Sequence, residues 1–73
     1  MPELPKISGA EALKIFERLG FHKVRQRGSH VIIRRGDKGT VVPFHSSLAP
    51  GTLRGAIRQA GLNVEEFVKA AKR

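Results

Sequence analysis

The absence of cysteine is the feature that most constrains what this 73-residue chain can fold into. Small domains bury a lower fraction of their surface than large ones, and many chains of this size compensate with disulfides or a structural metal. Disulfides and thiolate zinc sites are both unavailable here, so stability has to come from side-chain packing in one modest core. We therefore expect residues 1–73 to form a single domain, with flexibility in residues 1–7.

The N-terminal residues Met1 to Lys6 lack the apolar run of a signal peptide. No stretch of the chain approaches the roughly 20 apolar residues that a membrane span requires. The lack of cysteine also fits a reducing compartment. We interpret the chain as a soluble, cytoplasmic protein with no membrane attachment.

The first expected element is an amphipathic helix over residues 9–19. Ser8 and Glu11 have the spacing of a capping box, in which each side chain satisfies a backbone N–H of the other residue. Gly20 is suited to the left-handed C-terminal cap. Apolar residues at helical spacing form one face: Ala12, Ile15, Phe16 and Leu19.

Three runs rich in strand-forming residues follow, separated by glycine-containing turns. They predict strands at 21–26, 30–34 and 40–44, with turns at 27–29 and 36–39. Together they make a three-stranded antiparallel meander.

Alternation of side chains predicts the faces of the first strand but not of the second. In the first strand it places Lys23 and Arg25 on one face and His22 and Val24 on the other. The second strand contains three consecutive apolar residues, 31–33, so alternation leaves open which face is buried. The direction of the His30 side chain is open for the same reason.

Two further helices are expected after a loop at residues 45–50. The first has an apolar face of Leu53, Ala56, Ile57 and Ala60 and ends at Gly61. The second begins at Asn63, with Glu66 at the reciprocal capping position. The order α-β-β-β-α-α predicts an α+β two-layer sandwich, with helices on one face of the sheet and the other face open. We expect the first and last helices to pack side by side on the covered face.

Positive charge is concentrated in the middle of the chain. Fourteen Lys and Arg stand against six Asp and Glu, for a net charge of +8. One window with Asp37 as its single acid contains six of the basic residues: Lys23, Arg25, Arg27, Arg34, Arg35 and Lys38. Such a field attracts a polyanion, and membrane binding would favour a basic amphipathic helix, whereas this window has a strand pattern. Nucleic acid is therefore the expected partner.

Five ordered segments of this basic chain resemble the HicA (YcfA-like) toxin family. The resemblance spans residues 8 to 67 and rests on Gly20-Phe21, Arg25-Gln26-Arg27-Gly28-Ser29-His30, Val42-Pro43-Phe44-His45, Gly51-Thr52-Leu53-Arg54 and Gln59-Ala60-Gly61-Leu62. It implies a fold like that of the double-stranded-RNA-binding domain, ribonuclease activity on mRNA without a metal or cofactor, and a HicB-like antitoxin partner. The catalytic histidine of the family lies in a Gly-Ser-His element, which falls here on Gly28, Ser29 and His30.

Histidine suits RNA cleavage because an imidazole, with an ordinary pKa of roughly 6.5, is present in both forms near neutral pH. His30 is the expected general base or acid, acting on the RNA 2′-hydroxyl or the leaving 5′-oxygen. The paired N–H donors of arginine guanidinium groups, together with backbone N–H groups, would hold the phosphate. The predicted RNA-binding residues are Lys23, Arg25, Arg27, Gly28, Ser29, Arg34, Arg35, Lys38 and His45.

Several alternatives remain open on the sequence. Without the resemblance, a lone histidine after a turn is more often a surface residue than a catalyst, and His22 is interpreted as a solvated one. The histidines lack the His-x-His or His-x-x-x-His spacing of metal ligands, so no metal site is expected. The chain could instead be a non-catalytic RNA-binding module, or an interaction domain for an acidic protein, and only cleavage separates the first alternative from the toxin. With four Phe and no Trp or Tyr, base stacking is expected to be limited.

Overall fold

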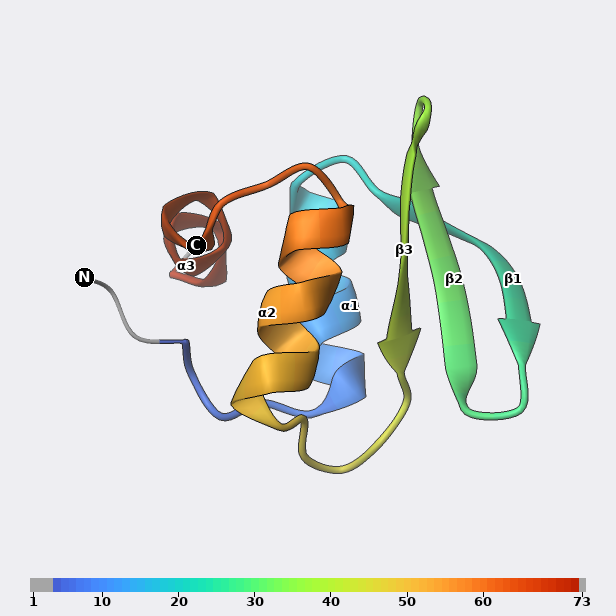
Figure 1. The fold of residues 1–73 in the computed structure, drawn as a ribbon, viewed down its shortest axis with the longest axis horizontal. Helices are drawn as coiled ribbons and strands as arrows, with labels where there is room; N and C mark the ends of the chain where they lie inside the picture. Colours follow the sequence, from blue (N-terminus) through green and yellow to red (C-terminus); the bar gives the residue numbers. More distant parts are fainter. Residues whose placement is uncertain (1–3, 73) are drawn as a thin grey trace.

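The computed structural model of this protein describes residues 4–72, and its elements follow the predicted order. They are α1 (Gly9–Arg18), β1 (His22–Arg27), β2 (His30–Arg35), β3 (Lys38–Pro43), α2 (Pro50–Gln59) and α3 (Val64–Ala71). The three strands form an antiparallel sheet in the order β1-β2-β3 (Figure 1). This α+β architecture confirms the predicted fold class and is consistent with the double-stranded-RNA-binding-domain-like fold.

The N-terminal segment was predicted to be flexible over residues 1–7. Residues 1–3 of that segment lie outside the described residues. In the remainder, Leu4 and Ile7 pack against the core, and the Ile7 carbonyl accepts a hydrogen bond of 2.9 Å from the Leu48 N–H. The flexibility itself stays a prediction.

Both predicted capping boxes are present. The Glu11 N–H donates to the Ser8 hydroxyl at 3.1 Å, and the Ser8 N–H donates to the Glu11 carboxylate at 3.0 Å. The backbone hydrogen bond from Ser8 is the main reason that the pKa of Glu11 is held below its ordinary value. Asn63 and Glu66 make the same reciprocal pair at the start of α3. These caps define where α1 and α3 begin.

The sheet has one buried face and one open face, and burial resolves the ambiguity in β2. Val31 and Ile33 are 1% and 2% exposed, so they lie on the face that joins the core. In β3 the buried positions are Thr40 and Val42. Because side chains alternate along a strand, His30, Ile32 and Arg34 of β2 lie on the open face.

The prediction that Lys23 and Arg25 share a face of β1 is wrong. The β1–β2 register shifts between these two residues, so that Lys23 pairs with Ile33 and Arg25 pairs with Ile32. Paired residues of antiparallel strands share a face. Lys23 therefore lies on the side of the core, and Arg25 lies on the open face. The extra residue of this β-bulge is Val24, and its insertion inverts the alternation on which the prediction depended.

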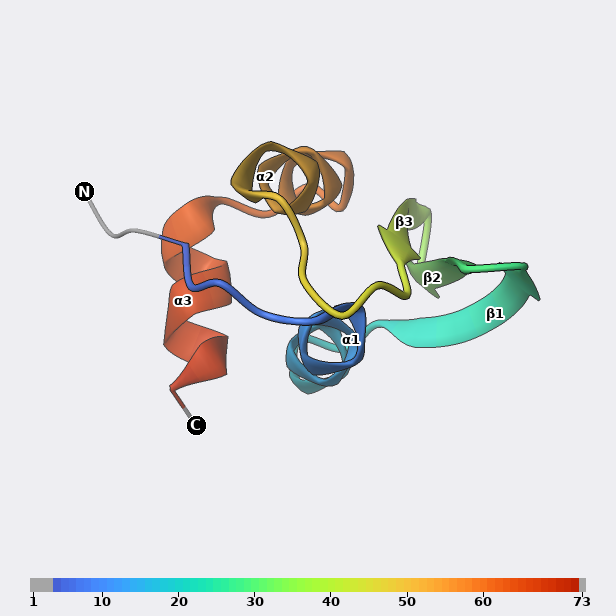
Figure 2. The ribbon, with the colours of Figure 1, turned by 90° about the horizontal axis from the view of Figure 1, so that it is seen from below.

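The last helix contacts the first, as expected, but the expectation that it packs on the sheet is wrong. Helices α1 and α2 contact β3, whereas α3 contacts α1 and α2 and lies on their far side from the sheet (Figures 1 and 2). The Phe67 ring of α3 packs on the Phe16 ring of α1, with centroids 5.1 Å apart, and Arg18 donates a hydrogen bond of 3.0 Å to the Ala70 carbonyl. Thus α3 covers the side of α1 and α2 that faces away from the sheet.

Helices with both the length and the apolar content to cross a membrane are absent between residues 4 and 72.

The start of α1 lies directly against the end of β3. The Gly9 N–H donates a hydrogen bond of 2.8 Å to the His45 carbonyl. A Cβ atom on Gly9 would collide with the Pro43 carbonyl oxygen and would lie 2.8 Å from the Cα atom of Phe44. Both atoms belong to the backbone at the end of β3, and a backbone cannot move aside as a flexible side chain can. Only glycine fits at this contact between helix and sheet.

We predict that Gly9→Ala lowers the free energy of unfolding by about 1–3 kcal/mol, because the added methyl group forces the β3 backbone away from α1. Gly55→Ala is the matched control, since Gly55 is in the interior of α2 and an added Cβ would meet nothing within 4 Å. That variant should gain about 0.5–1 kcal/mol from helix propensity. Urea denaturation followed by circular dichroism measures both, and equal effects of the two variants would contradict the close contact.

Candidate functional site

The strand register arranges the open face of the sheet into three rows that run from β1 across β2 to β3. The rows are Arg27–His30–Pro43, Arg25–Ile32–Val41 and His22–Arg34–Gly39. Three arginines and two histidines thus share this face, and its nine positions include no acidic residue. Paired side chains in neighbouring strands have Cβ atoms about 5 Å apart, so the rows form one continuous surface, with its positive charge on β1 and β2.

His30 stands at one corner of this surface. It is the first residue of β2 and directly follows the two-residue turn Gly28-Ser29, in which Gly28 has a φ of 57°. Glycine with positive φ at this position is typical of a type II′ hairpin turn. Backbone pairing with Arg27 on one side and Pro43 on the other holds the position of His30, while its side chain is exposed. The imidazole can therefore exchange protons with a bound substrate or with water.

The ladder between β2 and β3 continues past His30. The Phe44 N–H donates a hydrogen bond to the Ser29 carbonyl, so the chain leaving β3 stays beside the turn that carries the histidine. His45 follows, and its carbonyl is held by Gly9. The fold thus brings the predicted residue His45 to the same end of the sheet as His30. Its contact with RNA or antitoxin stays a prediction.

Arg34 occupies the opposite end of the open face, where Gly39 gives it room. A Cβ atom on Gly39 would lie 3.3 Å from Cγ and 3.9 Å from Nε of Arg34. The side chain of Arg34 therefore crosses β3 over the position where another residue would project. This contact places its guanidinium group on the open face together with Arg25 and Arg27.

The remaining basic residues of the predicted set lie elsewhere. Arg35 donates a hydrogen bond of 2.7 Å to the Leu19 carbonyl, and its guanidinium carbon is 5.0 Å from the centre of the Phe21 ring. The alkyl chain of Lys38 lies against Gly61, and the Lys23 ammonium donates a hydrogen bond of 3.3 Å to Gln26. The structure therefore groups Arg25, Arg27 and Arg34 with His30 and separates these from Lys23, Arg35 and Lys38.

His22 lies on the open face, although it is not among the residues predicted to bind RNA. It pairs with Arg34 because the bulge at Val24 returns it to the same face as Arg25. The run from Phe21 to Gln26 has only two apolar residues, Phe21 and Val24, and their odd spacing breaks the alternation without showing where a bulge lies. The same register also places Ile32 and Val41 at the centre of the site, where the sequence indicated only strand formation.

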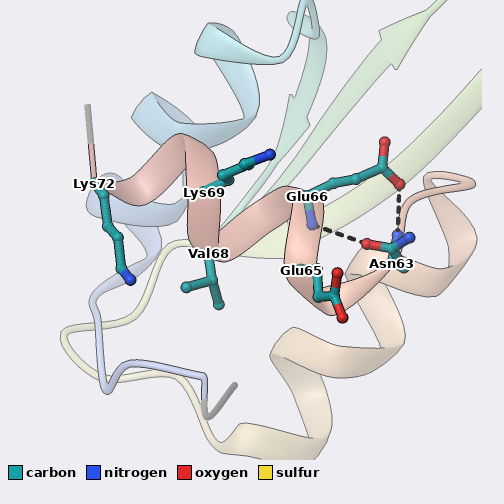
Figure 3. Close-up of a pocket in the computed structure, with 6 residues that line it drawn as sticks. All are labelled: Asn63, Glu65, Glu66, Val68, Lys69 and Lys72. Carbon is teal, nitrogen blue, oxygen red and sulfur yellow. Dashed lines mark hydrogen bonds between the residues drawn. The ribbon is translucent and has the colours of Figure 1, made fainter. Parts of the chain in front are cut away.

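A pocket on the far side of the molecule provides a contrast (Figure 3). Its lining comes entirely from the region of α3: Asn63, Glu65, Glu66, Val68, Lys69 and Lys72. Asn63 and Glu66 are already hydrogen-bonded to each other, and the charges are of both signs. We assign it no function.

In the part of the chain that the structure describes, no three His, Asp or Glu side chains gather as metal ligands would.

Comparison with models of protein families matches residues 9–62 to the HicA toxin of bacterial toxin-antitoxin systems. The matched range contains the whole sheet and therefore every residue of the open face. A search of curated proteins found no match.

We predict that Arg35→Ala lowers the free energy of unfolding by about 1–2 kcal/mol, because it removes a hydrogen bond to a carbonyl at the end of α1 and a cation–π contact. Arg34→Ala removes the same charge from the adjacent residue and should change stability by less than about 0.5 kcal/mol. Urea unfolding of the two variants measures the difference. Equal destabilisation would contradict the separation of the two arginines into a structural and an open-face residue.

Proposed function

Because this chain belongs to the HicA toxin family and so acts as the toxin of a toxin-antitoxin pair, we propose that it is an endoribonuclease that cuts mRNA at the open face of its sheet. His30 is its catalytic residue, and no metal takes part. The observation that carries this proposal is the position of His30 in one row with Arg27, on a face that also holds Arg25 and Arg34.

RNA carries its own nucleophile, so one histidine can promote cleavage. In the reaction proposed here, the 2′-oxygen attacks the adjacent phosphorus, and the bond from phosphorus to the 5′-oxygen breaks. The 2′-hydroxyl proton leaves, the 5′-oxygen gains a proton, and a cyclic phosphate remains. His30 takes or supplies one of these protons. Its exposed position at the corner of the sheet allows the ribose-phosphate chain to reach it without any rearrangement of the fold.

The arginines supply the binding of the phosphates and stabilise the charge of the transition state. A guanidinium group is planar and presents two parallel N–H donors, which match two oxygens of one phosphate. Arg27 pairs directly with His30, so it is the arginine best placed to hold the scissile phosphate. Gly28 adds an open approach beside it, because a Cβ atom there would meet nothing within 4 Å.

The toxin class implies an antitoxin, and we propose that this partner is HicB-like and inhibits by covering the open face. Acidic groups laid over Arg25, Arg27 and Arg34 would complement a surface with no acids of its own. Complementary charge speeds the encounter of two proteins and favours this partner over neutral ones. The same contact would bar RNA from His30.

We predict that His30→Ala lowers the rate of RNA cleavage by at least about 100-fold, the usual contribution of a general acid or base, while RNA binding is retained. The measurement is cleavage of a labelled transcript by purified, folded protein with EDTA present throughout. His22→Ala, which removes a histidine from the far row of the same face, should keep most of the activity.

Equal cleavage by wild type and His30→Ala would remove His30 from the mechanism. If EDTA abolished cleavage and one divalent ion restored it, the metal-independent reaction would be wrong. Wild-type protein that binds transcripts but leaves every phosphodiester intact would be a non-catalytic RNA-binding module.

We predict that open-face arginines account for the salt dependence of RNA binding. In a His30→Ala background that prevents cleavage, Arg25→Ala should lower the slope of log affinity against log salt by about 0.7. Lys23→Ala removes an equal charge from the core side of the sheet and should change the slope by much less. Titrations at four or more salt concentrations measure the slopes, and equal changes in both variants would mean that RNA does not distinguish the two faces.

A further inference from the structure

We propose that the open face is divided into two halves with different ligands: the β1 half binds RNA phosphates, and the β3 half binds unpaired bases, so that the substrate has to be single-stranded. This inference rests on the proposed function and adds to it the strandedness of the RNA and the orientation of each nucleotide across the sheet. It follows from the chemistry of the nine open-face positions, taken strand by strand.

The charge of the open face is confined to β1 and β2. The β1 positions are His22, Arg25 and Arg27, and β2 adds His30 and Arg34. The corresponding positions of β3 are Gly39, Val41 and Pro43, which carry no charge and no hydrogen-bonding side chain. A ligand with charge at one edge only would match this face. A polynucleotide strand, with phosphates along one side and bases along the other, has that form.

The uncharged half of the face is a continuous apolar stripe, made by Ile32, Val41 and Pro43. Ile32 and Val41 are paired directly across β2 and β3, and Pro43 is the next open-face residue along β3. Val41 is 40% exposed even though β3 is the strand that contacts α1 and α2. The Val41 side chain is therefore not part of the core. Flat nucleobases, which have apolar faces, can cover such a stripe.

An exposed aromatic residue, Phe44, directly follows Pro43 at the His30 end of the sheet. Three of the four phenylalanines are buried in the core, but Phe44 is 52% exposed. The hydrogen bond from its N–H to the Ser29 carbonyl holds its backbone next to the turn before His30. A phenyl ring there could stack one base. Stacking was expected to be limited on composition, and this one exposed ring is where it would occur.

The row that contains His30 indicates how one nucleotide would lie across the sheet. Arg27 lies on one side of His30 and Pro43 on the other. Neighbouring strands are about 4.8 Å apart, so β1 and β3 are separated by about 10 Å, comparable to the span of one nucleotide from its phosphate to the far edge of its base. With the phosphate on Arg27 and the base on Pro43, the ribose lies over His30. The ribose carries the 2′-hydroxyl that has to lose a proton.

A duplex could not be bound in this way. In an A-form helix the faces of the bases are stacked inside, and the exposed surface consists of phosphates, 2′-hydroxyl groups and polar base edges. The apolar stripe would then face charged backbone, without compensation for the water it loses. Unpaired bases can splay out onto the stripe, so single-stranded segments of mRNA are the expected substrate.

The test compares RNA with and without a base while the phosphates stay unchanged. In the His30→Ala background, a short unstructured RNA should bind more tightly than the same RNA annealed to its complement. Moving a single abasic ribose along the strand should reveal at least one position where affinity falls by about fivefold or more. Fluorescence anisotropy at fixed salt measures each affinity.

The variant that probes the stripe is Val41→Thr, which keeps the β-branched shape but adds a hydroxyl. It should weaken binding of the intact RNA and reduce the penalty of the abasic position, while the salt slope remains that of the parent. Phe44→Leu should act in the same direction. Val24→Thr is the matched control, because Val24 is 50% exposed and is the bulged residue of β1. It should leave affinity unchanged.

Two results would overturn the division of the face. The first is equal affinity for intact, abasic and duplex RNA. The second is a Val41→Thr variant that binds RNA normally but binds the antitoxin less tightly, which would make the stripe a protein contact. Either result with wild-type cleavage intact would leave the proposed ribonuclease function standing. If neither the wild-type protein nor the His30→Ala variant binds RNA at all, both proposals fail.

Discussion

Burial of Val31 and Ile33 is the constraint on which the rest of this molecule depends. Each is nearly inaccessible to water and lies in the core shared with the helices. Transfer of a side chain of this size out of water is worth about 1.5–3 kcal/mol, a large fraction of what a small domain has available. A slip of one residue would expose both and bury His30 and Arg34 instead. The same contact that stabilises the sheet therefore also decides which side chains remain free for a ligand.

Two adjacent arginines, Arg34 and Arg35, have different roles in the structure. Arg34 projects over Gly39 on the open face, and Arg35 turns back to the Leu19 carbonyl and the Phe21 ring at the end of α1. One of these two neighbouring charges is held by the fold, and the other lies on the open face. A strand makes this possible because successive side chains point to opposite faces. A basic cluster in a sequence is thus not equivalent to a basic surface.

The open face carries charge without local compensation, and this suits the toxin of a pair. Five acids of the described chain, Glu11, Glu17, Asp37, Glu65 and Glu66, lie in the first and last helices or at the tip of the second hairpin, and none occupies an open-face position. A surface of one sign binds a polyanion strongly, and it binds an acidic protein for the same reason. Under the proposed function, nucleic acid and antitoxin would compete for the same arginines, and inhibition would need no conformational change in the toxin.

Local patterns were sufficient for the element order, the capping boxes, the meander and the position of His30 at the start of a strand. Each of these depends on residues within a few positions of one another, such as Ser8 with Glu11 or Gly28 before His30. Which of the predicted residues lie together on one face was not accessible in this way. The bulge at Val24, the open side of β2 and the packing of α3 behind α1 all depend on contacts between segments distant in the chain. The burial energy of those contacts overrides local alternation, so only the folded structure separates Arg25 from Lys23 and places Arg27, His30 and Pro43 in one row.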